Sequence, residues 1–106
     1  MSYLQISGVP RTPWAEEALV IPVIGTVVTL DATKADGSLM VRGRLEGGPI
    51  RAQFLTPPTS TAGTPIYDAD VVEWTSPELD ALVATGGFVA ASTATLDATL
   101  YLTYYR

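Results

Sequence analysis

Carboxylates are the side chains of this sequence with the clearest capacity for chemistry. Asp68, Asp70 and Glu73 fall within one short stretch, and hard cations such as Ca²⁺ bind carboxylate oxygens supplied by loops. Their spacing matches no calcium-loop pattern, and Asp31 with Asp36 lacks the intermediate ligand of an EF-hand loop. We therefore interpret these acids as turn residues and local caps, and we predict no metal site.

Catalytic groups of the common kinds are not indicated. The sequence contains no His and no Cys, which removes the commonest general base and the usual transition-metal ligands. No pair of carboxylates stands out for glycoside hydrolysis, and the sequence has no phosphate-binding glycine loop and no nucleophile elbow. We predict that the protein is not an enzyme and uses no cofactor.

Aromatic side chains point to binding instead. Tyr101 and Tyr105 share one parity of the last strand, so both are expected on its more polar face. Tyrosine offers apolar area with a polar tip, which suits stacking on a sugar ring or packing beneath a partner subunit. Alternatively, a loop or the N-terminal segment of the same chain covers them. Further binding candidates lie in and after a Pro-rich loop at 56–65, namely Pro57, Pro58, Thr59, Tyr67 and Trp74.

The last strand is the most regular element of the sequence. From 94 to 105, residues alternate between an apolar set (Ala94, Leu96, Ala98, Leu100, Leu102, Tyr104) and a more polar set (Thr95, Asp97, Thr99, Tyr101, Thr103, Tyr105). A period of two predicts a strand with one buried face, and no helical period fits.

Short strands and turns account for most of the remaining chain. We expect strands near 18–21 and 26–31, an antiparallel hairpin over 38–54 after an Asp36-Gly37 turn, and further strands at 71–74 and 88–91. One helical turn is expected over 79–83, capped by Ser76. Seven to eight short strands predict an all-β fold, an antiparallel β-sandwich of jelly-roll-like or Greek-key type.

The N-terminal segment differs from the rest. Pro10 and Pro13 surround Arg11 and precede Trp14, a spacing that resists helix and favours an extended arm. We expect an arm over residues 1–16 and a single sandwich domain over 17–106. The arm residues Pro10, Arg11, Pro13 and Trp14 are candidates for contact with a neighbour, and the alternative is that Trp14 covers one end of the core.

The composition of the chain limits the classes of binding partner that we expect. With a net charge of −5 the chain is a poor match for nucleic acid. Arg42, Arg44 and Arg51 form at most a local patch, which Glu46 or other acids neutralise. No apolar stretch is long enough to cross a membrane and no secretion signal is present, so we expect synthesis in the cytosol of the producing cell. The low charged fraction, 16%, suits a protein packed among neighbours.

Residues 40–106 resemble a known group of proteins. Four stretches of this region resemble the layout of small β-sandwich virion proteins of tailed bacteriophages. They are VRGRLEGGPIRAQF, PPTSTAGTPIYDADVVEW, GGFVAAS and ATLDATLYLTYYR. The shared features are an arginine-bearing hairpin, a Pro-Thr-Ser loop followed by Gly-x-Pro, an acidic turn before a strand, and a last strand that ends in Tyr-Tyr.

The resemblance implies a non-enzymatic structural role in a phage virion, made in the host cytoplasm. Symmetric copies would act as a head decoration or cement protein, or as a neck or tail component. Their partners would be copies of the chain itself and other virion proteins such as the major capsid protein. The alternative is a receptor-binding or carbohydrate-binding module of a tail fibre or spike, in which exposed aromatics bind a glycan.

Overall fold

Two antiparallel sheets form the framework of the computed structural model, which describes residues 12–106. The larger sheet has the order β1-β7-β2-β5 and the smaller the order β4-β3-β6. The strands and helices of this part of the chain are β1 (Pro13–Ile21), α1 (Ala32–Ala35), β2 (Met40–Glu46), β3 (Ile50–Gln53), β4 (Thr64–Ile66), β5 (Val71–Thr75), α2 (Glu78–Ala84), β6 (Gly87–Ala90) and β7 (Ala98–Tyr105). The prediction of an all-β antiparallel sandwich is confirmed, with seven strands in the described range.

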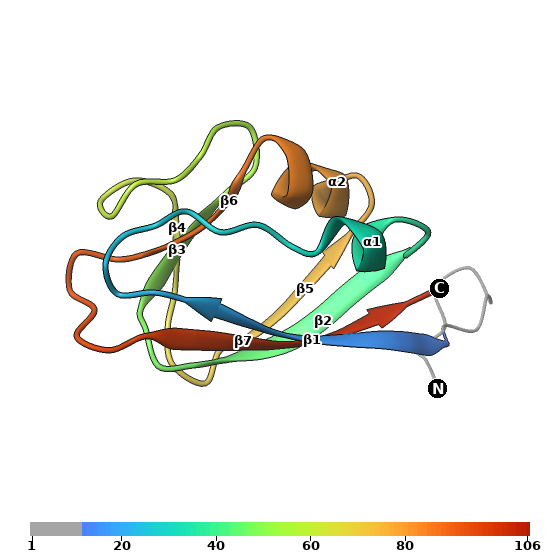
Figure 1. Ribbon diagram of the computed structural model, residues 1–106, viewed down its shortest axis with the longest axis horizontal. Coiled ribbons are helices and arrows are strands. Elements are labelled where there is room, and N and C mark those ends of the chain that lie inside the picture. The colour runs from blue at the N-terminus through green and yellow to red at the C-terminus, as the bar shows by residue number, and fades with distance from the viewer. Residues whose placement is uncertain (1–11) are drawn as a thin grey trace.

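The two layers differ in make-up. The four-stranded sheet runs along the whole molecule, whereas the layer facing it consists of the three-stranded sheet at one end and both helices at the other (Figure 1). Apolar side chains from both layers fill the space between them, and Trp74 packs against Phe88 with ring centroids 5.5 Å apart. The helices therefore complete a core that the smaller sheet is too short to cover.

β7 lies inside the larger sheet and pairs antiparallel with both β1 and β2. The alternation predicted for it holds from Ala98 to Tyr104, where every second side chain is buried. The predicted start at residue 94 is wrong: Leu96 is 73% exposed, and Asp97 Oδ1 accepts a hydrogen bond from the Val23 backbone N–H at 2.8 Å. Residues 94–97 are irregular, with a bend at Leu96, because alternation in sequence does not itself provide a pairing partner.

β1 begins earlier than the predicted boundary between arm and domain. It starts at Pro13 and pairs with β7, so Pro13 and Trp14 belong to the sheet. Thr12 and Arg106 exchange two backbone hydrogen bonds of 2.9 Å and close this end of the ladder. Of the predicted arm, residues 1–11 lie outside the described range.

Two local predictions for the middle of the chain are wrong, and a third is confirmed. The segment 38–54 is not a hairpin, because β2 belongs to the larger sheet and β3 to the smaller, and Gly47 and Gly48 (φ 88° and 97°) redirect the chain between them. The strand expected at 26–31 is reduced to one bridge, Val28 to Phe88. The turn expected at Asp36-Gly37 is present, with Gly37 at φ 80°, but it follows a short helix, α1, rather than a strand.

The second helix differs from its prediction at its start. α2 spans Glu78–Ala84, and Pro77 occupies the N-cap position without a side-chain hydrogen bond, so Ser76 does not cap it. Instead, Glu78 Oε1 accepts a hydrogen bond from the Thr75 backbone N–H at 3.4 Å.

Substitution of Gly43 tests the pairing of β2 with β7. A Cβ at this position would overlap the Tyr101 carbonyl oxygen and lie 2.6 Å from Leu102 Cδ2. We expect Gly43→Ala to lower the free energy of unfolding by about 1–3 kcal/mol, because β2 must move away from β7. Glu46→Ala, on the exposed face of the same strand, should change it by less than about 0.5 kcal/mol. Urea unfolding of both variants measures the difference, and equal stabilities would contradict the close β2–β7 approach.

Candidate functional site

The larger sheet has one face that no other element covers within residues 12–106 (Figure 1). We call it the outer sheet face. It is formed by Glu16, Ala18 and Val20 of β1, Thr99, Tyr101 and Thr103 of β7, Arg42, Arg44 and Glu46 of β2, and Val71 and Glu73 of β5.

The register of the strands sets the arrangement of this face. Tyr101 lies at its centre, paired with Ala18 on one side and Arg44 on the other, and Arg44 in turn pairs with Val71. Tyr101 and Val20 are each 50% exposed and Val71 is 65% exposed. The outer sheet face therefore has apolar side chains distributed across its whole width.

Charge on the outer sheet face is nearly balanced. Two arginines and three glutamates leave a net charge of −1 there, against −5 for the whole chain. Arg42 Nε lies 3.9 Å from Glu73 Oε1, and both side chains are about half exposed, so this pair contributes little to stability. Arg51 is not part of the patch: it lies on β3 in the other sheet, where Nη1 donates to the Gly63 carbonyl.

The predicted N-terminal interface residues fall in two groups. Pro10 and Arg11 lie outside the described residues. Pro13 is exposed at the start of β1, whereas Trp14 is held by its own chain: Nε1 donates to Ser38 Oγ at 2.9 Å, and Arg106 Cζ lies 4.2 Å from the ring centroid. Trp14 thus packs at one end of the core, and Tyr105 is half-buried at the same end of the sheet.

The loop candidates are not gathered into one site. Pro57 and Thr59 are exposed and Pro58 is buried. Tyr67 is 57% exposed, but Trp74 lies on β5 with only 8% of its surface exposed. The ring of Trp74 is therefore committed to the core and does not present a stacking face.

The acidic residues near this loop serve the backbone. Asp68 Oδ1 accepts a hydrogen bond from the Gly47 N–H at 3.0 Å, and Asp70 Oδ2 accepts one from the Tyr67 N–H at 2.8 Å. These are the turn and cap roles predicted for them. In the described part of the chain, no three His, Cys, Asp or Glu residues are grouped so as to hold a metal ion.

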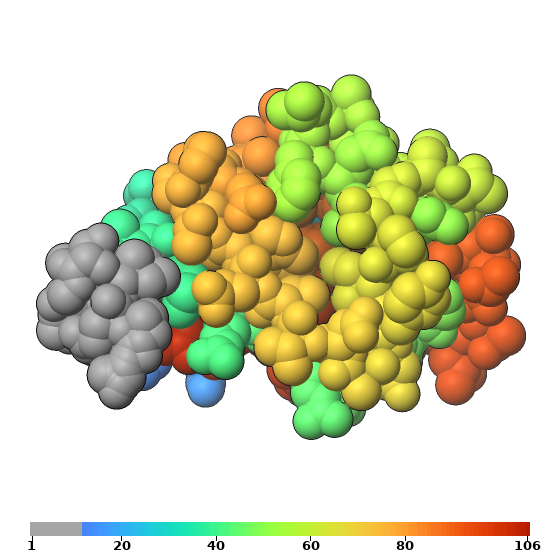
Figure 2. Space-filling view, turned by 180° about the vertical axis from the view of Figure 1, so that it is seen from behind, coloured from blue at the N-terminus to red at the C-terminus, as the bar shows by residue number. Residues whose placement is uncertain are grey.

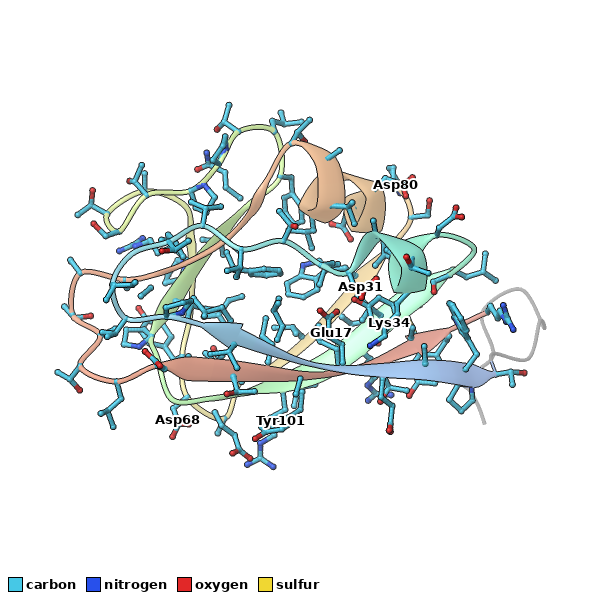
Figure 3. The ribbon with its side chains drawn as sticks, viewed as in Figure 1. Glu17, Asp31, Lys34, Asp68, Asp80 and Tyr101 are labelled. Atoms are coloured by element: carbon cyan, nitrogen blue, oxygen red, sulfur yellow. The ribbon has the colours of Figure 1, made fainter. Side chains whose placement is uncertain are left out.

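A polar junction inside the sandwich was missed by the sequence analysis. Tyr104 Oη donates to Glu17 Oε1 at 2.6 Å, and the Asp31 backbone N–H donates to the same oxygen at 3.3 Å. Asp31 Oδ1 in turn accepts from the Thr33 and Lys34 N–H groups and caps α1, and Lys34 Nζ donates to the Glu16 carbonyl at 2.7 Å. Glu17, Asp31 and Lys34 lie together between β1 and α1 (Figure 3).

The junction is suited to holding structure rather than to proton transfer. Burial of Tyr104, together with its hydrogen bond to Glu17 and the charge of that carboxylate, raises the pKa of the phenol far above its usual range. Tyr104 therefore stays protonated and remains a donor. The sequence did contain a sign of this: Glu17 falls on the same parity as Ala15, Leu19 and Ile21, the inward-facing set of β1.

A groove of about 350 Å³ was also missed. It lies between β5 on one side and β3 and β4 on the other, and its apolar wall includes Phe54, Ile66, Val72 and Trp74. Glu73 and Glu78 line it as well. Figure 2 shows the molecule from the side on which the segments containing β4 and β5 face each other. Sequence periodicity does not reveal such a groove, because its walls belong to different sheets.

Comparison with protein-family models, curated proteins and solved structures finds no match for this chain. Among the described residues, no helix is long and apolar enough to cross a membrane.

Removal of the Tyr104 hydroxyl tests the polar junction. We expect Tyr104→Phe to lower the free energy of unfolding by about 1.5–3 kcal/mol, because the Glu17 carboxylate loses its donor in a half-buried position. Tyr101→Phe on the same strand is the matched control and should stay within about 0.5 kcal/mol. Chemical denaturation at pH 7 compares them, and two equal losses would count against a specific role for Tyr104.

The raised pKa of Tyr104 predicts a loss of stability in alkali. In the unfolded chain the phenol ionises near pH 10, whereas in the folded chain it stays protonated, so above about pH 10 the unfolded state binds fewer protons. Stability should therefore fall by about 1.4 kcal/mol per pH unit from this group. In Tyr104→Phe this contribution is absent. Urea unfolding between pH 9 and pH 11 (about one unit either side of the usual value) should give a steeper decline for the wild-type chain, and parallel curves would refute the assignment.

Proposed function

We propose that the protein is a non-enzymatic structural protein of a phage virion, in which symmetric copies pack on the particle. Its place would be that of a head decoration or cement protein, or of a neck or tail component. Its partners would be other copies of the chain and virion proteins such as the major capsid protein.

The outer sheet face is the observation that carries this proposal. It combines exposed apolar side chains, Val20, Tyr101 and Val71, with half-buried threonines and a nearly balanced charge. Copies with a net charge of −5 repel one another at long range, so a nearly neutral face is where two of them can approach. An uncovered antiparallel sheet with apolar residues at its centre is suited to packing against a second protein surface.

Two further observations support the same proposal. The low charged fraction of 16% fits a surface that is partly covered in its working state. The similarity of residues 40–106 to the turn and strand layout of small tailed-phage virion proteins suggests the particle on which this packing would occur.

The outer sheet face is too small to form a stable interface between copies by itself. Eight residues at about 3.3 Å and four strands at about 4.8 Å give a face of about 26 by 19 Å, or about 500 Å². A stable protein interface buries about 800 Å² on each partner. A second contact is therefore needed to hold copies together at low concentration.

The receptor-binding or carbohydrate-binding alternative depends on exposed aromatics. Tyr67 and Tyr101 are exposed enough to stack on a sugar ring, whereas Trp74 is not. A glycan array tests this alternative directly: specific hits that Tyr67→Ala abolishes would favour it over the structural role.

Substitution at the centre of the outer sheet face tests the proposed packing. Tyr101→Asp introduces a charge that two packed sheets would have to desolvate, and we expect it to weaken self-association at least ten-fold in sedimentation velocity runs. Ile24→Asp is the control, because Ile24 is an exposed apolar side chain in the connection between β1 and α1, outside the strands that form the outer sheet face. It should leave association unchanged.

The particle itself provides the complementary measurement. Negative-stain images of particles with and without the protein should differ by regularly repeated surface density, and Tyr101→Asp should reduce its occupancy. A chain that remains a monomer at every concentration and binds no particle would overturn the proposed function.

A further inference from the structure

The groove between β5 and β4 lies where both sheets have an open edge. Within the described residues β5 pairs only with β2, and β4 pairs only with β3. Each strand therefore presents backbone groups that no other strand pairs on the side away from its partner, although the Thr75 N–H donates to Glu78 Oε1. Such edges accept an added strand from another chain.

The groove offers an apolar lining beside these open edges. Val72 and Trp74 come from β5, Ile66 comes from β4, and Phe54 follows β3. A strand placed along β5 would direct alternate side chains toward these residues, because side chains on a strand alternate between its two faces. The open side of the sandwich is thus shaped for an extended segment with apolar residues at every second position.

The chain itself contains a segment of this kind in residues 1–11. In its sequence, MSYLQISGVPR, the alternation covers residues 4–7, with Leu4 and Ile6 on one parity and Gln5 and Ser7 on the other. Met1, Tyr3 and Val9 share the parity of Gln5 and Ser7. Eleven residues reach about 36 Å when extended, whereas β5 has only five residues. The segment is therefore long enough to pair with the whole of β5.

Charge also matches the segment to the groove. Residues 1–11 carry Arg11 and no acidic side chain, and the groove is lined by Glu73 and Glu78. The rest of the chain is strongly acidic, so this segment differs from it in sign.

We propose that residues 1–11 of a second copy bind as an added strand along β5 and insert Leu4 and Ile6 into the groove between β5 and β4. This inference rests on the proposed function, because it supplies the second contact that the outer sheet face requires. The donor in this proposal is a second copy because the outer sheet face alone is too small to hold copies together, and only a contact between copies adds to it. A contact between two different surfaces of this kind joins copies head to tail, and it closes into a ring when the rotation between them allows.

The first test compares substitutions at alternate positions of the segment, made in the full chain. We expect the double variant Leu4→Asp with Ile6→Asp to weaken self-association at least ten-fold in sedimentation runs. The matched control is Gln5→Asp with Ser7→Asp, which adds the same charge to the same segment on the opposite parity. It should stay within about three-fold of the wild-type chain, a difference below about 1 kcal/mol. Equal weakening by both variants would overturn the insertion of Leu4 and Ile6.

Cross-linking locates the segment. The chain has no cysteine, so Ile6→Cys chains mixed with Thr64→Cys chains and treated with a short bis-maleimide should give a covalent dimer. Thr33→Cys on α1, away from the groove residues, is the control and should give none with Ile6→Cys. If the chain carrying both Ile6→Cys and Thr64→Cys cross-links only within itself, the segment binds its own chain and the proposal is overturned.

Failure of this inference can be told apart from failure of the proposed function. Copies that associate through Tyr101 but give no Ile6–Thr64 cross-link would refute the groove and leave the packing role standing. Copies that never associate would refute both.

Discussion

The pairing of β7 with a strand on each side is the constraint on which the structure depends. Hydrogen bonds to β1 and β2 place β7 in the interior of the larger sheet, and its alternate residues from Ala98 to Tyr104 then form the floor of the core. The close approach to β2 requires a residue without a side chain at Gly43. The same pairing exposes the other parity, so the burial of Leu100 and Leu102 and the exposure of Tyr101 have one cause. Core and outer sheet face are thus two consequences of a single register.

The second layer depends on a polar contact as well as on apolar burial. The smaller sheet covers only part of the larger one, and α1 and α2 cover the rest (Figure 1). α1 has only four residues, too few to be stable through its own backbone hydrogen bonds. Glu17 and Tyr104 supply what it lacks: the carboxylate accepts from Tyr104 and from the residue that caps the helix. A charged residue on the inward face of β1 is therefore explained by the helix above it.

The sequence predicted the fold class and the inner face of β7, because a period of two is a direct consequence of strand geometry. It failed where the outcome depends on partners. The alternation at Ala94 and Leu96 lies in an irregular segment before β7, since nothing in a pattern shows where pairing stops. The hairpin expected over 38–54 is two strands of different sheets, because periodicity does not identify a strand's neighbour. Of the candidate site, Tyr101 was placed on the more polar face of its strand, whereas the groove depends on sheet edges that only the tertiary fold brings together.

The pairing of Thr12 with Arg106 has a mechanical meaning. β1 and β7 are adjacent and antiparallel, and the two ends of the described chain meet at one end of their ladder. A force that separates Thr12 from Arg106 breaks the hydrogen bonds of this ladder one after another instead of shearing them all at once. The reason is that both residues lie at the same end of the ladder, and its bonds lie across the strands. The fold therefore has little resistance to tension applied through its ends. A force applied through the faces of the sheets is distributed over many contacts. Neighbouring proteins bound to these faces would therefore destabilise the fold far less than neighbours that apply force at Thr12 and Arg106.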